Sequence, residues 1–439
     1  MRIADLNGKK VCILGFGKEA KAMFHAIEDY APNAYLTMAD KNPEPIHALI
    51  EANSPSNPTK MKTPWITRAG PDAWLRAIDT FDVIIKSPGI PTLPELVPYA
   101  SKITTSTQIF FDSIQGSGAM TIGVTGSKGK STTASLIAAI LKEAGKNVHL
   151  VGNIGEPAIA HIADAKKGAI FVMEMSSYQL MDLRTSPHIA VVTSFFPEHL
   201  DYHGSEEAYL EAKKNIARFQ NPHDVVFFST NFFGSTEIAK EGEGRKIPFS
   251  EVDSPVELAD IQLIGAHNLS NIAGAYEVAL ELGVKPEVAI QVIKNFKGLP
   301  HRLQSMGTKD GIEWIDDAIS TTPESTIAAL DALGDRVHTV ILGGQDRGYD
   351  FSALAERIKK SSVKTIILFP GSGSRIRDAL IQNNVTARLL NADSMEKAVT
   401  IAKEETKDGI VLLSTASPSY GMFKNFEEKG EIFKKCIGL

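Results

Sequence analysis

The stretch 120-MTIGVTGSKGKSTTASLIAAILKEAG-145 is predicted to form a strand, a glycine-rich loop and a helix. Its apolar residues 120–125 are typical of a buried strand, and the alanine-rich run 131–144 has helical spacing of apolar residues and ends before a glycine. The usual phosphate-binding loop reads G-x-x-x-x-G-K-[ST]. Here only two residues separate Gly126 from Gly129. We therefore predict a phosphate-binding loop of an unusually short type.

Backbone N–H groups from Gly126 to Lys130 are expected to surround a phosphate in this loop, while the Lys130 ammonium offsets its charge. The Ser131 hydroxyl follows at the position that reaches a magnesium ion in such loops. The predicted nucleotide loop comprises Gly126, Ser127, Lys128, Gly129, Lys130, Ser131 and Thr132.

Two further candidates follow strand-like runs downstream of the loop. Glu174 ends an apolar run, where a buried acid is costly unless it is paired or binds a metal; a carboxylate bonded only to backbone is the alternative. His199 follows the strand-like run 189–195 and is expected near the same edge of the sheet. His199 and His203 have the i, i+4 spacing of a zinc pair, but Gly204 interrupts the helix and no upstream ligand pair accompanies them, so zinc is disfavoured.

Strand-like and helix-like segments alternate along the whole chain, which is typical of βαβ units and mostly parallel sheets. The proline-rich residues 88–98 and the turn 298–300 are expected to connect domains. The predicted fold class is therefore α/β, with three consecutive α/β domains at 1–108, 109–299 and 300–439. The central domain is expected to be of the P-loop ATPase type, and the outer two Rossmann-like.

The composition of the 439 residues is that of an ordinary globular protein, with 43% hydrophobic and 22% charged residues. The net charge is −6 and Lys and Arg are scattered, which disfavours nucleic acid and anionic membranes as partners. Cys12 and Cys436 stand at opposite ends of the chain in apolar surroundings, so neither a disulfide framework nor a thiolate metal site is expected. Because no segment is typical of a signal peptide or a membrane span, we expect a cytoplasmic protein.

The pattern Gly15-x-Gly17-x-x-Ala20 lies between a strand-like and a helix-like run, and Asp40 ends the next strand-like run. This spacing is typical of a dinucleotide-binding turn, in which small residues admit a pyrophosphate to a helix N-terminus. A nucleotide diphosphate is the favoured interpretation, and a tight turn without a ligand is the alternative. A dehydrogenase would use this turn but would leave the central domain without a role. Residues 87–89 end another strand-like run, and this segment alone favours equally the opposite side of the same cleft and a turn without a ligand.

Seven short motifs follow one another over the chain: GSKGKST at 126–132, GNIG at 152–155, EMSSYQL at 174–180, EHLD at 198–201, EAK at 211–213, GAHNLSN at 265–271 and PHR at 300–302. Together they resemble the Mur ligase family, whose members are ATP-dependent amino-acid ligases of peptidoglycan synthesis. The short first domain, the KNFE motif at 424–427 and the total length are most similar to the members that add D-glutamate to UDP-N-acetylmuramoyl-L-alanine. The resemblance implies a monomeric enzyme that acts on ATP, D-glutamate and this UDP-linked substrate.

The resemblance implies a reaction in which the substrate carboxylate attacks the γ-phosphate of ATP, and the amine of glutamate then displaces phosphate from the acyl phosphate. It also implies two magnesium ions, one held by Ser131 and Glu174 and the other by His199 and Lys213. In the family the matching lysine is carbamylated by carbon dioxide, which makes it an anion. Without the family match the residues favour a surface lysine at 213 or 214, and the EAK motif selects Lys213. The implied catalytic residues are Lys130, Glu174, His199 and Lys213.

The resemblance assigns the remaining site residues to three ligands. For the adenosine side of ATP they are Asn268, Asn271, Arg302 and Asp317. For the UDP-linked substrate they are Gly15, Phe16, Gly17, Lys18, Asp40, Lys41, Ser87, Pro88, Gly89, Asn153 and His199. For glutamate they are Thr321, Arg347, Ser419 and Phe426.

The expected glutamate pocket departs from the family pattern. The family motif NDSKATN corresponds to 316-DDAISTTPE-324, which retains Asp317 but has Ile319 where a glutamate-binding lysine often stands. Arg347 occupies a second position where lysine is frequent, and a guanidinium holds a carboxylate with two hydrogen bonds. The identity and handedness of the amino acid are therefore open. The alternatives are a sister ligase for another amino acid, a ligase like folylpoly-γ-glutamate synthase, and a non-catalytic nucleotide-binding regulator.

Overall fold

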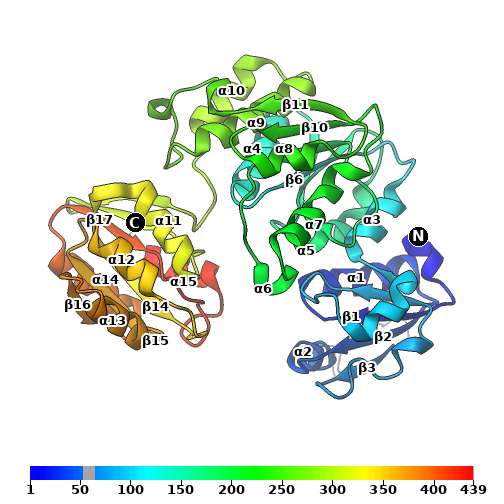
Figure 1. Ribbon diagram of the computed structural model, residues 1–439, viewed down its shortest axis with the longest axis horizontal. Helices are drawn as coiled ribbons and strands as arrows, with labels where there is room; N and C mark the ends of the chain where they lie inside the picture. The colour runs from blue at the N-terminus through cyan, green and yellow to red at the C-terminus, as the bar shows by residue number, and fades with distance from the viewer. Residues whose placement is uncertain (53–64, 439) are drawn as a thin grey trace. The chain divides into compact units, whose positions relative to one another are not determined.

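Three β-sheets follow one another along the chain in the computed structural model, within the residues that it describes, 1–52 and 65–438 (Figure 1). The predicted α/β class with three consecutive sheets is confirmed. The three sheets lie inside the ranges 1–108, 109–299 and 300–439, whereas the limit between 108 and 109 falls within helix α3 (Ser106–Ile114). The domain limits themselves remain predictions.

The first sheet is parallel and has the strand order β3-β2-β1-β4-β5. Its winding reverses at β1, because β2 lies on one side of that strand and β4 on the other. Ligands commonly bind at such a reversal, beyond the carboxyl ends of the strands. The elements are β1 (Lys10–Leu14), α1 (Lys18–Tyr30), β2 (Tyr35–Asp40), α2 (Glu44–Ala52), β3 (Trp65–Ala69), β4 (Val83–Lys86), β5 (Ile103–Thr104) and α3.

The second sheet is also parallel and has the order β11-β10-β9-β6-β8-β7. Because β9, β6 and β8 are neighbours in it, the loops that follow these strands share one edge. Its strands are β6 (Met120–Thr125), β7 (Asn147–Gly152), β8 (Ala169–Glu174), β9 (Ile189–Val192), β10 (Val225–Ser229) and β11 (Arg245–Phe249). The accompanying helices are α4 (Lys130–Glu143), η4 (Ala158–Asp164), α5 (Ser177–Leu180), α6 (Leu200–His203), α7 (Glu206–Arg218), α8 (Phe233–Ala239), α9 (Asn268–Glu281) and α10 (Pro286–Asn295).

The third sheet has the order β12-β13-β17-β14-β15-β16, and β12 pairs antiparallel with β13 while the other pairs are parallel. Its strands are β12 (Gln304–Lys309), β13 (Ile312–Asp316), β14 (Val337–Gly344), β15 (Thr365–Gly371), β16 (Arg388–Asn391) and β17 (Gly409–Leu413). Its helices are α11 (Pro323–Leu333), α12 (Ser352–Lys359), α13 (Gly373–Gln382), α14 (Met395–Glu405) and α15 (Phe426–Ile437).

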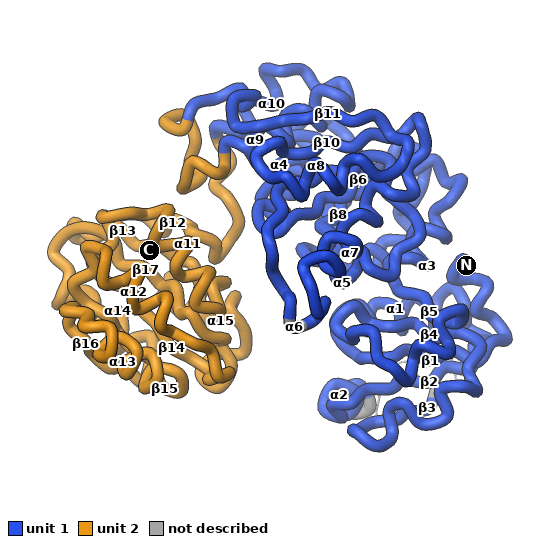
Figure 2. The backbone as a smooth tube through the Cα atoms, in the orientation of Figure 1, with its two compact units in different colours: residues 1–257, 269–294 blue, residues 258–268, 295–439 orange. Residues whose placement is uncertain are grey.

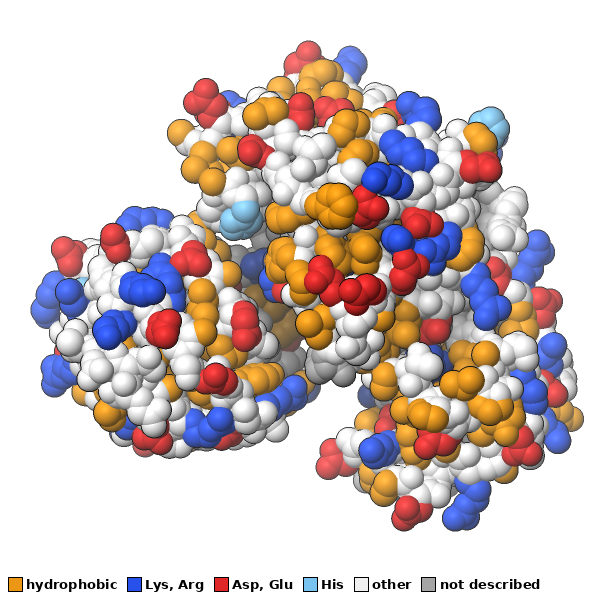
Figure 3. All heavy atoms as spheres, viewed as in Figure 1, with side chains coloured by type: hydrophobic (Ala, Val, Ile, Leu, Met, Phe, Trp, Pro, Cys, Tyr) orange, Lys and Arg blue, Asp and Glu red, His pale blue; other side chains and the backbone are white. Residues whose placement is uncertain are grey.

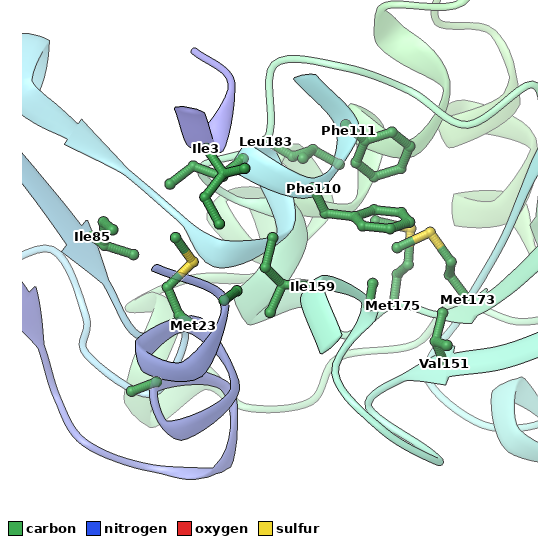
Figure 4. Packing of buried hydrophobic residues seen from close by; sticks show 14 of the residues in the cluster. Ile3, Met23, Ile85, Phe110, Phe111, Val151, Ile159, Met173, Met175 and Leu183 are labelled. Atoms are coloured by element: carbon green, nitrogen blue, oxygen red, sulfur yellow. The ribbon is translucent and has the colours of Figure 1, made fainter. Parts of the chain in front are cut away.

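By its internal contacts the chain divides into two compact units, drawn in different colours in Figure 2. Unit 1 comprises residues 1–257 and 269–294, and unit 2 comprises residues 258–268 and 295–439. Within unit 1 the first and second sheets share a hydrophobic core. Met23 of α1, Phe110 of α3 and Ile159 of η4 belong to the same buried cluster (Figure 4). This shared core holds the first sheet against the second and so positions the loops of both.

Positive and negative side chains are interspersed on the face shown in Figure 3, as the scattered charges of the sequence predict. Over the described part of the chain, every helix is too short or too polar to cross a membrane.

Candidate active site

The loop between β6 and α4 is closely packed by its neighbours. Gly126 and Gly129 have φ angles of 155° and 86°, which residues with side chains rarely adopt. A Cβ atom at Gly126 would overlap the Thr193 hydroxyl, and one at Gly129 would overlap the side-chain oxygen of Asn271. Both glycines are therefore required by the path of the loop. Asn271, which was predicted at the adenosine side, lies against this loop.

The residues that follow β9 accept hydrogen bonds from part of the loop. The N–H of Ser127 donates to the carbonyl oxygen of Ser194 at 2.9 Å, and the N–H of Lys128 donates to the Ser194 hydroxyl at 2.8 Å. The Ser127 hydroxyl donates to the carbonyl oxygen of Phe196 at 2.7 Å. These two amides therefore do not join the phosphate-facing set expected from 126 to 130. The amides at 131–132, in the first turn of α4, precede the first intrahelical bond and are of the kind that binds phosphate.

The two lysines of the loop have different surroundings. The Nζ of Lys130 donates to the carbonyl oxygens of Gly126 and Ser127, both at 2.9 Å. Its ammonium thus lies along the loop, where it can neutralise a bound phosphate. The Nζ of Lys128 is 2.6 Å from Glu198 Oε1, and the Lys128 side chain is largely exposed. Lys130 is the better placed of the two for compensating phosphate charge.

Glu174 ends β8 and is almost fully buried, with 2% of its surface exposed. Its Oε1 accepts a hydrogen bond from Asn153 Nδ2 at 2.9 Å, whereas its Oε2 has no hydrogen-bond partner among the described residues. A buried carboxylate oxygen without a partner is costly in a folded protein. This favours a bound cation beside Glu174 over a carboxylate satisfied by backbone donors. The same contact brings Asn153, predicted at the muramoyl substrate, to the edge of the second sheet.

Lys213 of α7 is buried at the phosphate loop. Only 1% of its surface is exposed, and its Nζ lies 2.8 Å from the carbonyl oxygen of Gly126 and 4.8 Å from the centre of the Tyr209 ring. Burial, and then the charge of Lys130, lower the pKa of Lys213 well below its ordinary value. Lys214 instead lies near the surface, with its Nζ 2.6 Å from Glu211 Oε1. The structure thus places Lys213, and not Lys214, beside the loop.

His199 is the residue before α6 and has a left-handed backbone with φ of 57°. The residue as a whole is exposed, yet loss of solvent around the ring is the largest cause that lowers the pKa of His199. The charge of Glu198 opposes this shift, and the positive charge of Lys130 adds to it. A neutral ring has a lone pair for a metal. His203 turns elsewhere, because its Nε2 lies 3.0 Å from the Ser177 hydroxyl and its ring stacks on Tyr178.

The glycine turn after β1 contacts the loop after β4, at the point in the first sheet where the strand order reverses. The Ser87 hydroxyl donates to the carbonyl oxygen of Gly15 at 2.6 Å, and a Cβ atom at Gly15, where φ is 83°, would press on the Ser87 side chain. Asp40 accepts the Phe16 N–H at 2.6 Å and the Asn42 N–H at 2.7 Å. Asp40 thus caps two turns. The Phe16 side chain is buried in the core, so only its backbone borders the turn.

Contacts within unit 1 connect this turn to the edge of the second sheet. Lys18 Nζ donates to the carbonyl oxygen of Gly155, in the loop that carries Asn153. The Tyr202 hydroxyl of α6 lies 2.6 Å from the carbonyl oxygen of Pro88. The remaining predicted residues of this set, Gly17, Lys41 and Gly89, are exposed.

Unit 2 contains three of the residues predicted at the adenosine side. Asp317 is 3% exposed and accepts hydrogen bonds from the Ser414 hydroxyl at 2.8 Å and the Leu303 N–H at 3.2 Å. Burial raises the pKa of Asp317 to about 6. Arg302 is exposed, and Asn268 Nδ2 donates to the carbonyl oxygen of Ile264 at 2.9 Å.

The four residues predicted to bind glutamate also lie in unit 2. Ser419 is 4% exposed, and its hydroxyl has no hydrogen-bond partner among the described residues. Arg347 is exposed, and its Nε donates to Gln345 Oε1 at 3.3 Å. Thr321 is half-buried, and Phe426 begins α15. The side-chain donors in this set are thus the buried hydroxyl of Ser419, the half-buried hydroxyl of Thr321 and the exposed guanidinium of Arg347.

Two family models match the chain: the Mur ligase middle domain at residues 124–233 and the Mur ligase glutamate ligase domain at residues 301–417. A Micromonospora protein, named UDP-N-acetylmuramoyl-L-alanine–L-glutamate ligase, is 35% identical and aligns over 100% of this chain and 98% of its own length. The chain belongs to the Mur ligase family.

Further comparisons extend to both enantiomers of glutamate and to the fold. A Streptococcus mutans protein, named UDP-N-acetylmuramoylalanine–D-glutamate ligase, is 33% identical to this Mur ligase over 98% of the chain and 97% of its own. The crystal structure of the UDP-N-acetylmuramate-alanine ligase MurC from Thermotoga maritima has a TM-score of 0.58 at 16% identity, covering 97% of this chain and 98% of that one. At that identity the likeness shows the shared fold.

Sequence reasoning missed one buried polar cluster of this Mur ligase, in unit 2. Lys429 of α15 is 1% exposed, and its Nζ donates to the Thr415 hydroxyl at 2.6 Å. Burial lowers the pKa of Lys429 to about 8, and the charge of Asp316 opposes that shift. His301 Nδ1 lies 2.7 Å from Asp316 Oδ2, which raises the pKa of His301. The available signal was helical spacing, since Lys429 shares a face with Phe433.

Proposed function

We propose that this Mur ligase forms a peptide bond between UDP-N-acetylmuramoyl-L-alanine and glutamate, with conversion of ATP to ADP and phosphate. Relatives named for this substrate and for glutamate align over 98% to 100% of the chain. The observation that carries the mechanism is the burial of Lys213 against the phosphate loop. The product would serve peptidoglycan synthesis, and through it cell shape and division.

Lys213 is proposed to carry a carbamate. Its lowered pKa favours the neutral amine, which is the form that attacks carbon dioxide. A bond forms between Nζ and the carbon of carbon dioxide, one proton leaves Nζ, and the side chain becomes an anion. An anion at this position would also relieve the repulsion between Lys213 and Lys130.

The residues at this edge fit two magnesium ions. Ser131 and Glu174 would hold one ion, which would give the buried Glu174 Oε2 the partner that it lacks among the described residues. The neutral ring of His199 and the carbamate of Lys213 would hold the other. When bound, the ions supply positive charge that offsets the charge of the phosphates.

The protein residues would act by binding and charge compensation. The amides at 131–132 and the Lys130 ammonium would hold the phosphates while the muramoyl carboxylate attacks the γ-phosphorus and ADP leaves. The glutamate amine would then attack the acyl carbon, and phosphate would leave. Asn153 would orient the muramoyl substrate beside Glu174. No protein nucleophile is required by these steps.

The first sheet is proposed to bind the UDP portion. The contact between Ser87 and Gly15 closes one side of the turn at the reversal of the winding, where ligands bind in folds of this class. The activity is proposed for a cytoplasmic monomer with small-molecule partners, organised as a UDP domain at 1–108, an ATP domain at 109–299 and an amino-acid domain at 300–439.

The enantiomer of glutamate has two candidates. D-Glutamate follows from the resemblance of the first domain and the KNFE motif, and the Streptococcus mutans relative is named for it. L-Glutamate is supported by the name of the Micromonospora relative, which is 35% identical. The unusual Ile319 and Arg347 fall in the expected glutamate pocket, so the pocket residues do not decide between the two.

Phosphate release from ATP tests the proposal directly. The purified chain is assayed with UDP-N-acetylmuramoyl-L-alanine, magnesium and one of D-glutamate, L-glutamate, L-alanine, L-lysine or diaminopimelate. We expect release with a glutamate enantiomer, and with none of L-alanine, L-lysine and diaminopimelate. Release that needs no muramoyl substrate, or that is fastest with another amino acid, would contradict the proposed function.

A further inference from the structure

Three side chains of the types that bind metals come together on β7 and η4 of unit 1. It comprises His149, His161 and Asp164, all half-buried, and one ligand atom of each lies within 4.8 Å of the others. Asp164 Oδ2 is 3.1 Å from His161 Nδ1 and 3.8 Å from His149 Nδ1. The proposed steps with ATP, the muramoyl substrate and glutamate use none of the three.

These separations suit a small transition-metal ion. Zinc binds histidine nitrogen and carboxylate oxygen at about 2.0–2.2 Å, so two ligands of a tetrahedral ion lie roughly 3.3 Å apart. The two measured distances fall on either side of this value. Two imidazoles and one carboxylate suit zinc or a neighbouring transition metal, whereas magnesium takes mostly oxygen ligands. A water molecule would complete the four-coordinate site.

Both imidazole rings are held by further contacts. The Nε2 of His161 lies 2.9 Å from Glu156 Oε2, which leaves Nδ1 as the nitrogen that faces Asp164. A carboxylate at the second nitrogen is the usual way in which a metal-binding histidine is oriented. The ring of His149 stacks on Phe171 with ring centres 5.0 Å apart. These contacts restrain both rings, and the Nδ1 atom of each lies within 3.8 Å of Asp164 Oδ2.

We propose that His149, His161 and Asp164 bind one divalent transition-metal ion, for which zinc is the best match. The ion would join β7 to η4, on either side of the loop at residues 153–157. That loop carries Asn153, which donates to Glu174, and Gly155, which accepts from Lys18. An ion bound on both sides of the loop would restrain the loop and stabilise these two contacts. The effect on substrate rests on the proposed function, whereas metal binding itself does not.

Metal binding to the full-length chain tests the inference. The chain is stripped with a chelator, and zinc is titrated by calorimetry in the presence of excess magnesium; cobalt is titrated in parallel by its visible absorption. We expect one tight equivalent of zinc in the wild type and the strong absorption of tetrahedral cobalt. His161→Gln should lose both, whereas His223→Gln, at an exposed histidine outside the cluster, should keep both. His199→Gln should also keep them, which separates this site from the proposed magnesium site.

Two further variants distinguish a loss of zinc binding from a folding defect. Glu156→Gln leaves all three ligands intact and should weaken zinc binding about 10- to 100-fold through the loss of the orienting carboxylate. Asp164→Asn should weaken binding while the circular dichroism stays that of the wild type. Zinc should also raise the melting temperature of the wild type and leave that of His161→Gln unchanged.

Equal zinc binding by the wild type and His161→Gln, or no zinc binding by the wild type, would overturn the inference. Ligase activity with magnesium and ATP is measured separately. Its absence in a folded wild type would count against the proposed function and would leave the zinc result standing.

Discussion

The Nζ of Lys213 lies 2.8 Å from the carbonyl oxygen of Gly126, so α7 delivers a buried amine to the phosphate loop. A permanently charged lysine is a poor neighbour for Lys130, and burial removes the water that would otherwise screen the two charges. The contact is therefore best explained by an amine that is neutral or chemically modified.

Lys213→Ala is expected to lower turnover about 100- to 1,000-fold, because the charge stabilisation at the transferred phosphate would be lost. Acetate or formate should restore part of the activity, since a short carboxylate can occupy the place of the carbamate. Lys214→Ala is the control, and its turnover should match the wild type because that side chain forms surface ion pairs. Initial rates with and without the added acid provide the measurement. Full turnover by Lys213→Ala without an added acid would contradict the carbamate proposal.

Gly129→Ala is expected to raise the KM for ATP and to destabilise the fold. The backbone at position 129 would keep a φ of 86°, which is unfavourable for alanine, and the new Cβ would overlap the Asn271 side chain. Gly145→Ala is a matched control, because Gly145 has a φ of 74° but nothing within 4 Å of an added Cβ. That control should carry only the backbone strain of roughly 1–2 kcal/mol. Denaturant unfolding and ATP kinetics separate the two effects, and an unchanged KM in Gly129→Ala would contradict the packing argument.

The catalytic candidates were accessible from sequence because each stands in a local pattern. Lys130 follows a glycine loop, Glu174 ends an apolar strand and Lys213 belongs to a short motif. The bond from the Lys128 N–H to Ser194 was not predictable, since it joins residues 66 positions apart through the pairing of β6 with β9. Phe16 illustrates a second limit. A turn pattern does not tell whether a residue offers its backbone or its side chain, and here the side chain is in the core.

Asp317→Asn is expected to flatten the pH dependence of stability in mildly acidic solution. The pKa of Asp317 is raised from 3.8 to about 6 by burial, so the folded protein holds a proton that the unfolded chain releases between these values. The contribution of Asp317 to the free energy of unfolding is fully present below about pH 4. It falls by roughly 3 kcal/mol as the pH rises to about 6. The amide has no such titration. Urea unfolding at several pH values measures the difference, and parallel curves for wild type and variant would contradict the raised pKa.

Lys429→Met is expected to flatten the pH dependence of stability in alkaline solution. The pKa of Lys429 is lowered from 10.5 to about 8, so between these values the unfolded chain binds more protons than the folded protein. The stability of the wild type should therefore gain roughly 3 kcal/mol from this group between about pH 8 and pH 10.5. Lys429→Met should lack this gain, whereas Lys434→Met, at an exposed lysine of the same helix, should retain it. Unfolding curves across this range provide the measurement, and a gain retained in Lys429→Met would contradict the assignment.

Arg347→Lys is expected to raise the KM for glutamate about tenfold or more while leaving the KM for ATP unchanged. A guanidinium holds a carboxylate with two parallel hydrogen bonds, and an ammonium cannot reproduce that geometry; a hydrogen bond to a charged group contributes about 1.5–3 kcal/mol. Arg336→Lys is the control, because Arg336 is an exposed arginine of the same unit whose Nη1 lies 3.2 Å from Glu313. Both enantiomers of glutamate are tested with each variant. A selective loss with the preferred enantiomer would place Arg347 at the substrate carboxylate, and an unchanged KM for both enantiomers would remove Arg347 from the pocket.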